Sequence, residues 1–340
     1  MKKLLLCLLL VPLAIGPAAA GEKPVWPAPP DKPRIEYLET LTAGKRADGK
    51  RGKFGKMLDF LLGVVSGGRS EQEFLRPTGI WVTENAVFVA DPGVGRVMVR
   101  DKASGKSRWV PSARRHRMPF PVGVAVAPDG RLFVSDPELG GVSVFDPEGK
   151  PLPGLAAPPQ GFQRPTGLAL DAKLSRLYVS DTGTHSVSAY GLDGRYLFTF
   201  GGRGGGAGEL NYPTYLWADS GTGRVLVCDS GNFRVRIFDP EGKPAGGFGE
   251  MGDRPGYLAR PRGIAADSDG DVYSVDGALE AVQIFDEKGR LLLYFGESGG
   301  APGYFSMPGG IFVDGQDRIY VADSFNSRVQ VFQYLKADAR

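Results

Sequence analysis

Residues 213–248 read PTYLWADSGTGRVLVCDSGNFRVRIFDPEGKPAGGF, and this stretch holds one complete structural unit. It contains four short runs in which apolar and polar residues alternate, separated by turn-forming residues. Alternation over four to eight residues is typical of β-strands. The four runs are 215–218, 224–228, 234–238 and 244–248. The stretch therefore predicts a small sheet of four strands.

The same unit recurs six times along the chain. A Pro, usually followed two residues later by Gly, returns every 44 to 48 residues, and an Asp follows each time. A fixed period of this length in a β-rich chain marks a propeller or an array. The prolines are Pro77, Pro121, Pro165, Pro213, Pro261 and Pro308, and the aspartates are Asp91, Asp136, Asp181, Asp229, Asp276 and Asp323.

Tight turns favour antiparallel strands within each unit. Asp-Gly pairs such as Asp129-Gly130, Asp193-Gly194 and Asp269-Gly270 supply the positive φ that short hairpins require. Fifty Gly and 27 Pro also argue against a helical bundle. Six such sheets cannot each cover both faces alone, so we expect them to stack around an axis.

The last repeat is short of one strand. It has three runs, at 310–313, 318–322 and 328–334, whereas residues 34–41 (RIEYLETL) have strand composition and precede the first repeat. We expect 34–41 to form the outermost strand of the sixth sheet, because this pairing removes an exposed edge. The sequence thus predicts an all-β, six-bladed β-propeller of four-stranded antiparallel blades, with the last blade closed by an N-terminal strand.

Residues 1–20 have the layout of a secretory signal. Lys2 and Lys3 precede an apolar run, and small residues follow it up to Ala20. We expect cleavage after Ala20 and a periplasmic or extracellular protein with no transmembrane span, because about twelve apolar residues are too few to cross a bilayer. Cys7 within the run leaves a lipoprotein anchor as the alternative.

The remaining segments complete the predicted layout. We expect a Pro-rich linker at 21–33, the propeller at 74–335 and a C-terminal tail at 336–340. Residues 42–73 do not fit the repeat, and 56–62 (KMLDFLL) have the apolar spacing of a short amphipathic helix. This helix either covers the propeller or docks on a partner or a membrane surface.

Charge and cysteine content exclude some classes of protein. Loss of Lys2 and Lys3 lowers the formal net charge from +3 to about +1, which does not support nucleic-acid binding. Cys228 is then the single cysteine, so no internal disulfide forms. We interpret Cys228 as a small buried residue, because other repeats carry Ala or Ser at its position.

Two repeats carry the motif of a known family. Residues 227–234 (VCDSGNFR) and 321–328 (VADSFNSR) each place Asn three and Arg five positions after the repeated Asp. With the aromatic-Gly pair and Pro-x-Gly before it, this pattern resembles the NHL repeat, over about residues 74–335. The resemblance implies a six-bladed propeller. It implies no single activity, because NHL propellers include RNA binders, sensor domains and a lyase.

The departures from this motif predict an asymmetric rim. Asp136 is followed by PELGG at 137–141 and Asp276 by GALEA at 277–281, so these loops are apolar where their counterparts are polar. The third repeat instead places His185 near the Asn position. A specific ligand would need such asymmetry.

The six aspartates invite a catalytic or metal-binding interpretation, but a structural one is stronger. A residue that recurs in every blade serves a purpose that every blade shares, and Asp after a strand can accept turn amides and pair with a following Arg. We expect Arg96, Arg234 and Arg328 to be those partners.

Metal chemistry has little support in the sequence. Catalytic zinc takes three protein ligands, and His116 and His185 are the only two histidines. The innermost strands carry no acid within their cores, so calcium ligands would have to come from loops. We therefore expect no cofactor, and a metal-dependent lactonase-like or lyase-like enzyme with its site at the central channel remains the alternative.

We expect binding at the loops before each Pro and after each Asp, because these loops emerge on one face around the channel mouth. Arg and aromatic residues there are of the types enriched at binding hot spots. The candidates are Arg76, Arg164, Tyr212, Arg260 and Arg262 from one loop set, and Leu139, His185, Phe233 and Phe325 from the other.

A basic segment lies between the first two blades. Arg114, Arg115, His116 and Arg117 could grip an acidic protein, a polyanionic sugar or a phosphate group, or form a solvated loop. Together these observations predict an exported, monomeric, non-catalytic propeller that recognises a protein or glycan partner in the cell envelope.

Overall fold

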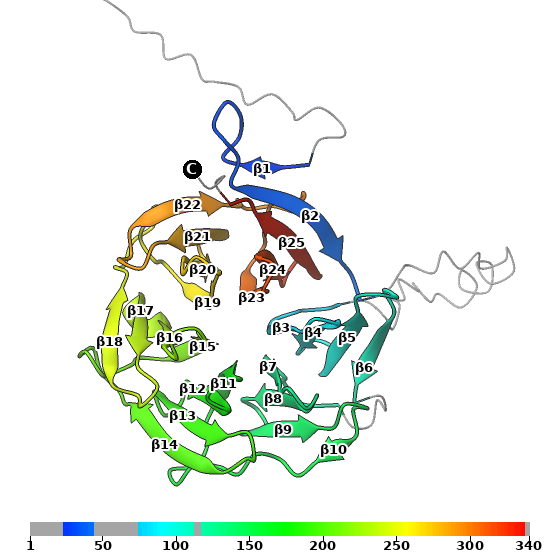
Figure 1. Cartoon of the computed structure of the whole chain (residues 1–340), viewed down its shortest axis with the longest axis vertical. Coiled ribbons are helices and arrows are strands. Elements are labelled where there is room, and N and C mark those ends of the chain that lie inside the picture. The colour runs from blue at the N-terminus through cyan, green and yellow to red at the C-terminus, as the bar shows by residue number, and fades with distance from the viewer. Residues whose placement is uncertain (1–22, 44–73, 112–116, 337–340) are drawn as a thin grey trace, which may run out of the picture.

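The computed structural model describes residues 23–43, 74–111 and 117–336. Within these ranges the chain forms six antiparallel sheets arranged as blades around a central axis (Figure 1). Five sheets have four strands, and the blade that joins the two ends of the chain has five. The predicted all-β, six-bladed architecture is confirmed.

Several sequence predictions fall outside the described residues. These are the signal sequence at 1–20, the amphipathic helix within 42–73, and Arg114, Arg115 and His116 of the basic segment. They stay predictions.

The first three blades follow one another along the chain, each with its first strand innermost. Blade 1 consists of β3 (Ile80–Val82), β4 (Ala86–Asp91), β5 (Arg96–Asp101) and β6 (Ser107–Val110). Blade 2 consists of β7 (Gly123–Val126), β8 (Leu132–Asp136), β9 (Gly141–Phe145) and β10 (Pro151–Leu152). Blade 3 consists of β11 (Pro165–Asp171), β12 (Arg176–Asp181), β13 (Ser186–Gly191) and β14 (Tyr196–Gly201).

The other three blades complete the ring. Blade 4 consists of β15 (Pro213–Ala218), β16 (Val225–Asp229), the short 3-10 helix η2 (Ser230–Asn232), β17 (Arg234–Phe238) and β18 (Pro244–Phe248). Blade 5 consists of β19 (Pro261–Ala266), β20 (Val272–Asp276), β21 (Ala281–Phe285) and β22 (Leu291–Phe295). Blade 6 consists of β23 (Pro308–Val313), β24 (Arg318–Asp323), β25 (Arg328–Tyr334), β2 (Ile35–Leu41) and β1 (Val25–Trp26).

Blade 6 is closed as the sequence predicts. β2 pairs antiparallel with β25, with Ile35 opposite Tyr334 and Leu41 opposite Val329. Ile35 is fully buried in the core of this blade. The segment predicted as a linker also contains β1, a short strand that pairs with β2 and brings the Trp26 ring to 5.8 Å from the ring of Phe332.

The Pro-x-Gly motif exists because the innermost strands approach one another closely. A Cβ atom on Gly79 would lie 2.3 Å from the carbonyl oxygen of Val122 in the next blade, and one on Gly123 would lie 2.1 Å from that of Thr166. Such distances exclude any side chain. Blade 4 is the exception, because it has Tyr215 at this position.

The hydrophobic core lies between neighbouring blades. Alternate residues of each innermost strand face opposite neighbours, as the period of two requires. Ile80 and Val82 pack with blade 6 residues such as Phe312, whereas Trp81 between them also packs against the core shared with blade 2. The ring is therefore a continuous series of sheet-to-sheet contacts.

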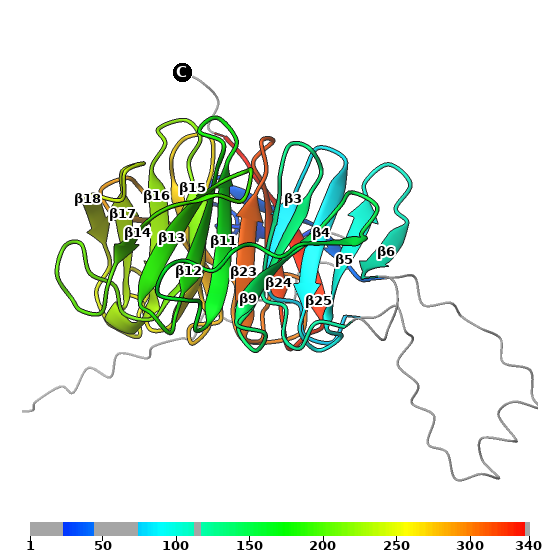
Figure 2. The ribbon, with the colours of Figure 1, turned by 90° about the horizontal axis from the view of Figure 1, so that it is seen from below.

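The two faces of the ring differ in their loops. We call the face that carries the repeated Asp residues the clamp face, and the face that carries the turns after the innermost strands the hairpin face. β23 points upward in Figure 2, so the hairpin face is uppermost in that view. No helix in the described part of the chain has the length and apolarity to span a membrane.

Candidate binding site

The repeated aspartates hold the clamp face together. All six carboxylates are buried, with at most 3% exposure. Each accepts backbone N–H groups from the loop that enters its own blade, as Asp91 does from Leu75 at 2.7 Å and Asp276 from Ala259 at 2.7 Å. Several N–H donors satisfy each carboxylate, so these residues fix the loops around the channel.

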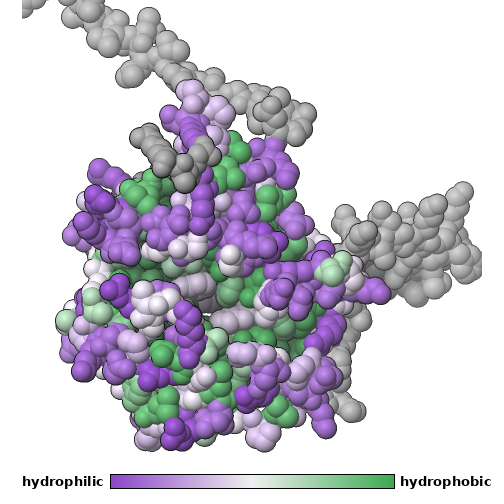
Figure 3. Space-filling model, in the orientation of Figure 1, coloured by the Kyte–Doolittle hydropathy of each residue, from purple (hydrophilic) through white to green (hydrophobic). Residues whose placement is uncertain are grey.

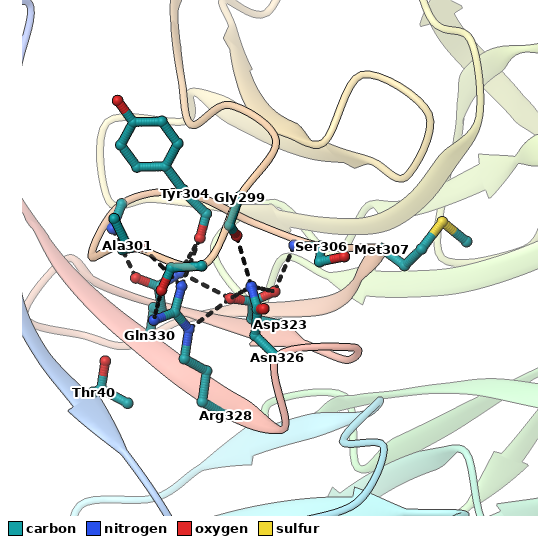
Figure 4. Close-up of polar contacts among 12 residues, drawn as sticks. Thr40, Gly299, Ala301, Tyr304, Ser306, Met307, Asp323, Asn326, Arg328 and Gln330 are labelled. Atoms are coloured by element: carbon teal, nitrogen blue, oxygen red, sulfur yellow. Dashed lines mark hydrogen bonds and ion pairs between the residues drawn. The ribbon is translucent and has the colours of Figure 1, made fainter.

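In blades 4 and 6 the Asn and Arg of the motif extend this network. Arg234 and Arg328 each donate from Nε to the repeated Asp at 2.7 Å. The Arg328 guanidinium also donates to the carbonyl oxygens of Gly300, Ala301 and Tyr304, so it holds the incoming loop (Figure 4). In blade 1, Arg96 is buried and lies opposite Asp91 in the strand register.

The position after the motif Asn adopts a left-handed backbone in every blade. It is Gly in blades 1 and 2, and His185, Phe233, Glu280 and Ser327 in the others, with φ between 51° and 70°. His185 is only 7% exposed, and its Nδ1 accepts the backbone N–H of Tyr212 at 3.1 Å. The Glu280 carboxylate likewise accepts the N–H of Met307 at 2.9 Å. Both side chains therefore join one blade to the next.

The predicted rim residues lie on the clamp face, and only some of them meet. The Arg76 guanidinium lies 5.4 Å from the centre of the Phe325 ring, and the rings of His185 and Tyr212 are 4.5 Å apart. Leu139, Tyr212 and Phe325 are more than half exposed. Arg164 and Arg117 are exposed, and Phe233 is half-buried.

Two departures from the repeat lie at the clamp-face end of the channel. Tyr215 occupies the position of the motif Gly, and Arg262 occupies a position where blades 1, 3 and 4 have Thr. Burial raises the pKa of Tyr215 to about 12, and the nearby Arg262 charge and Thr78 hydroxyl oppose this rise. Tyr215 thus reaches from blade 4 towards residues of blades 5 and 1.

A cavity of about 900 Å³ occupies the channel and opens on the hairpin face. Figure 3 shows a hollow near the centre of the ring, with hydrophobic residues inside a hydrophilic rim. Tyr215 belongs to its lining, together with the turns that follow the innermost strands. None of the predicted binding residues within the described ranges lines this cavity.

Three large aromatic side chains from equivalent positions line the cavity. Trp81, Trp217 and Phe312 occupy the middle of the innermost strands of blades 1, 4 and 6, where blades 2, 3 and 5 have Ala. The Phe312 ring lies 5.2 Å from that of Trp81 and 5.3 Å from that of Trp217. Trp217 and Phe312, from blades that are not adjacent, meet because Ala265 in blade 5 leaves space between them.

Polar groups surround the cavity at its open end. Asn85, Ser220, Thr222 and Arg224 lie in the hairpin turns that line it. Asp219 also lines it, and this carboxylate accepts the Gly221 N–H at 2.8 Å and the Thr222 hydroxyl at 2.5 Å. The site therefore combines an aromatic interior with hydroxyl, amide and charged groups at its mouth.

The cavity residues are not among the predicted binding residues, although the sequence contains a signal for them. At one position of the innermost strand, three repeats have Trp or Phe and the other three have Ala. Among residues 23–43, 74–111 and 117–336, no group of three or more His, Cys, Asp or Glu side chains could hold a metal ion. Cys228 is fully buried, and burial raises the pKa of its thiol to about 11.

Comparison with known proteins agrees with this geometry. Residues 305–332, which cover the loop into blade 6 and most of that blade, match the model of the NHL repeat. The chain is a six-bladed β-propeller that carries the NHL repeat. No curated protein matches the sequence of this chain.

Solved structures similar to this propeller have several functions. An auxiliary nutrient binding protein from Bacteroides thetaiotaomicron VPI-5482 is 14% identical with a TM-score of 0.60, over 77% of this chain and 70% of that one. A gluconolactonase from Xanthomonas campestris is 16% identical with a TM-score of 0.59, over 77% and 87%. Virginiamycin B lyase from Staphylococcus aureus is 11% identical with a TM-score of 0.56, over 76% and 95%. At these identities the likeness shows the fold alone.

Proposed function

We propose that this NHL propeller is an exported, non-catalytic binding protein that holds a glycan in its central cavity. The observation that carries the proposal is the trio of Trp81, Trp217 and Phe312 inside a cavity that opens on the hairpin face. The ligand site proposed here therefore lies at the opposite end of the channel from the loops that the sequence analysis favoured.

The chemistry of the cavity suits a sugar. The apolar C–H faces of sugar rings pack on indole and phenyl rings, and Trp81 and Trp217 are half-buried with part of each ring open to the cavity. Hydroxyl groups need partners that both donate and accept, and Asn85, Ser220 and Thr222 supply them at the mouth. A volume of about 900 Å³ lies within the range of ligand pockets, so a short oligosaccharide fits.

Binding has more support than catalysis. The described residues bring together no set of metal ligands, and the Asp219 carboxylate at the cavity mouth already accepts hydrogen bonds from its own turn. One similar structure is named a nutrient binding protein, although the similar lactonase and lyase show that the fold also hosts enzymes. We propose export because of the signal-like layout of residues 1–20.

A glycan array tests the proposal directly. We expect the purified protein to retain a restricted set of glycans, and Trp217→Ala to weaken binding of the best one by about tenfold or more, because it removes a stacking surface. Trp109→Ala is the matched control, since this half-buried Trp of β6 does not line the cavity. Retention of no glycan, or equal binding by the wild type and Trp217→Ala, would contradict the proposal.

A further inference from the structure

The clamp-face end of the channel gathers positive charge. Arg76 and Arg260 precede the motif Pro of blades 1 and 5, and Arg262 follows the Pro of blade 5. We call these three residues the arginine cluster. Threonines at the Arg262 position in other blades bond across to the next blade, as Thr78 does to the Val122 carbonyl at 3.1 Å. Arg262 replaces that contact with a charged group, beside a blade that has Gly309 at the same position.

The charges of the arginine cluster are not neutralised within the described residues. No carboxylate there forms an ion pair with Arg76, Arg260 or Arg262. The neighbouring Asp276 is already occupied, because it accepts the backbone N–H groups of Ala259, Arg260, Ala278 and Leu279. Three positive groups at one mouth repel one another, and a bound anion would relieve this repulsion.

The pKa of Arg262 reflects the proximity of the three guanidinium groups. Burial lowers the pKa of this guanidinium, Tyr215 opposes that effect, and the charges of Arg260 and Arg76 lower the pKa further. Arg262 is half-buried, whereas Arg76 and Arg260 are exposed. The cluster therefore has a partly desolvated centre and two accessible flanking charges.

Exposed apolar side chains lie on the same face as the arginine cluster. Phe325 is 57% exposed, Leu139 is 54% exposed and Tyr212 is 52% exposed. The Arg76 guanidinium lies 5.4 Å from the centre of the Phe325 ring. A guanidinium that packs on a ring keeps its N–H edge available, and this edge matches a planar carboxylate. Arg beside exposed aromatics is the composition of protein-binding hot spots.

We infer that the clamp face binds an acidic segment of a protein partner, which places a carboxylate in the arginine cluster. Charge complementarity selects the acidic residue, and Leu139, Tyr212 and Phe325 supply the apolar contacts around it. This site lies at the opposite end of the channel from the glycan cavity, so the inference does not depend on the proposed function.

Fluorescence anisotropy with a fluorescein-labelled hexaglutamate peptide tests this inference. We expect the full chain to bind the peptide, and both Arg262→Met and Arg76→Met to weaken binding by about tenfold. Arg164→Met is the matched control, because Arg164 has the same repeat position as Arg76 and Arg260 but lies in blade 3. We expect it to change the affinity by less than about twofold, and hexaglutamine not to bind.

Three outcomes would overturn the inference. They are no binding of hexaglutamate, an equal loss in Arg164→Met, and displacement of the peptide by an equal concentration of a single-stranded oligonucleotide, which would indicate a site for nucleic acid instead. Because unfolding also abolishes binding, thermal melting of each variant accompanies the titration. Glycan binding by Arg262→Met should equal that of the wild type, which separates failure of this site from failure of the cavity.

Discussion

The two ends of the central channel are built from the same repeat yet differ in shape and charge. At the hairpin face the channel is open and aromatic, and acids such as Asp219, Asp267 and Glu287 line the cavity there. At the clamp face Tyr215 of blade 4 reaches across the channel towards Thr78 of blade 1, and it lies near Arg262 of the arginine cluster. Residues that recur in all six blades build the ring. Residues that differ from the repeat in individual blades determine the shape and charge of each end of the channel.

The largest loss of stability should come from substitution of an Asp that recurs in every blade. Asp229→Ala removes the acceptor of Asn211 N–H at 2.6 Å and the partner of Arg234 at 2.7 Å, and it leaves a partly buried guanidinium without its carboxylate. We expect a loss of about 3 to 5 kcal/mol in the free energy of unfolding, measured by urea denaturation.

The control for this prediction is Asp239→Ala in the same blade. Asp239 accepts only the N–H groups of Glu241 and Lys243 in its own turn, so the loss should be about 1 kcal/mol. Equal losses for the two variants would mean that the clamp-face aspartates have no special role in stability.

A smaller loss of stability is expected on substitution of Tyr215, which differs from the Gly of the repeat. Tyr215→Ala removes a ring that lines the cavity and whose hydroxyl lies near Thr78 and Arg262, so we expect a loss of about 2 to 4 kcal/mol by the same measurement. Tyr212→Gly, three residues earlier, should change stability by less than about 1 kcal/mol. Tyr212 is 52% exposed, and its φ of 49° suits Gly. If Tyr215→Ala is as mild as this control, the Tyr215 ring does not pack against Thr78 and Arg262 as described.

The sequence predicts the shared positions far better than the departures. The spacing of Pro, Gly and Asp predicts the ring, and the strand missing from the last repeat predicts its closure by 34–41. Apolar alternation predicts strands β17 and β18 with their observed bounds. The cavity could not be derived in this way. Trp217 and Phe312 lie in blades 4 and 6, on either side of Ala265 in blade 5, and their contact depends on how residues from separate blades face one another.

The arginine cluster shows the same limit. The sequence analysis placed Arg76, Arg260 and Arg262 on one rim, because the direction of each strand decides which loops share a face. It could not tell that His185 is buried against Tyr212 while Phe325 is exposed beside Arg76. The exposure of a side chain at the rim depends on contacts between loops of different blades. A local sequence pattern does not determine these contacts.

The smallest effect concerns the acids of the hairpin face. Burial, followed by the charges of Asp267 and Asp269, raises the pKa of Asp271 to about 6 in the folded protein. The unfolded chain loses this proton near its ordinary pKa, so stability should fall as the pH rises from about 4 to about 6. Asp271→Asn should therefore raise the melting temperature by roughly 1 to 3 °C at pH 7.5 and leave it unchanged at pH 3.5.

Asp253→Asn, at an exposed acid of the blade 4 to blade 5 loop, is the control for charge removal alone. A pH-independent rise that is the same in both variants would show that the acids near Asp271 do not interact as described.

Blocking one end of the channel at a time tests which end binds the glycan. Cys228 is buried, so single cysteines introduced into a Cys7→Ser background can be labelled selectively with a bulky maleimide. The two sites are Ser220→Cys at the cavity mouth and Leu139→Cys on the clamp face. We expect the label at residue 220 to abolish binding of the best array glycan and the label at residue 139 to leave that binding intact. Loss of binding with the label at residue 139 but not with that at residue 220 would contradict this expectation.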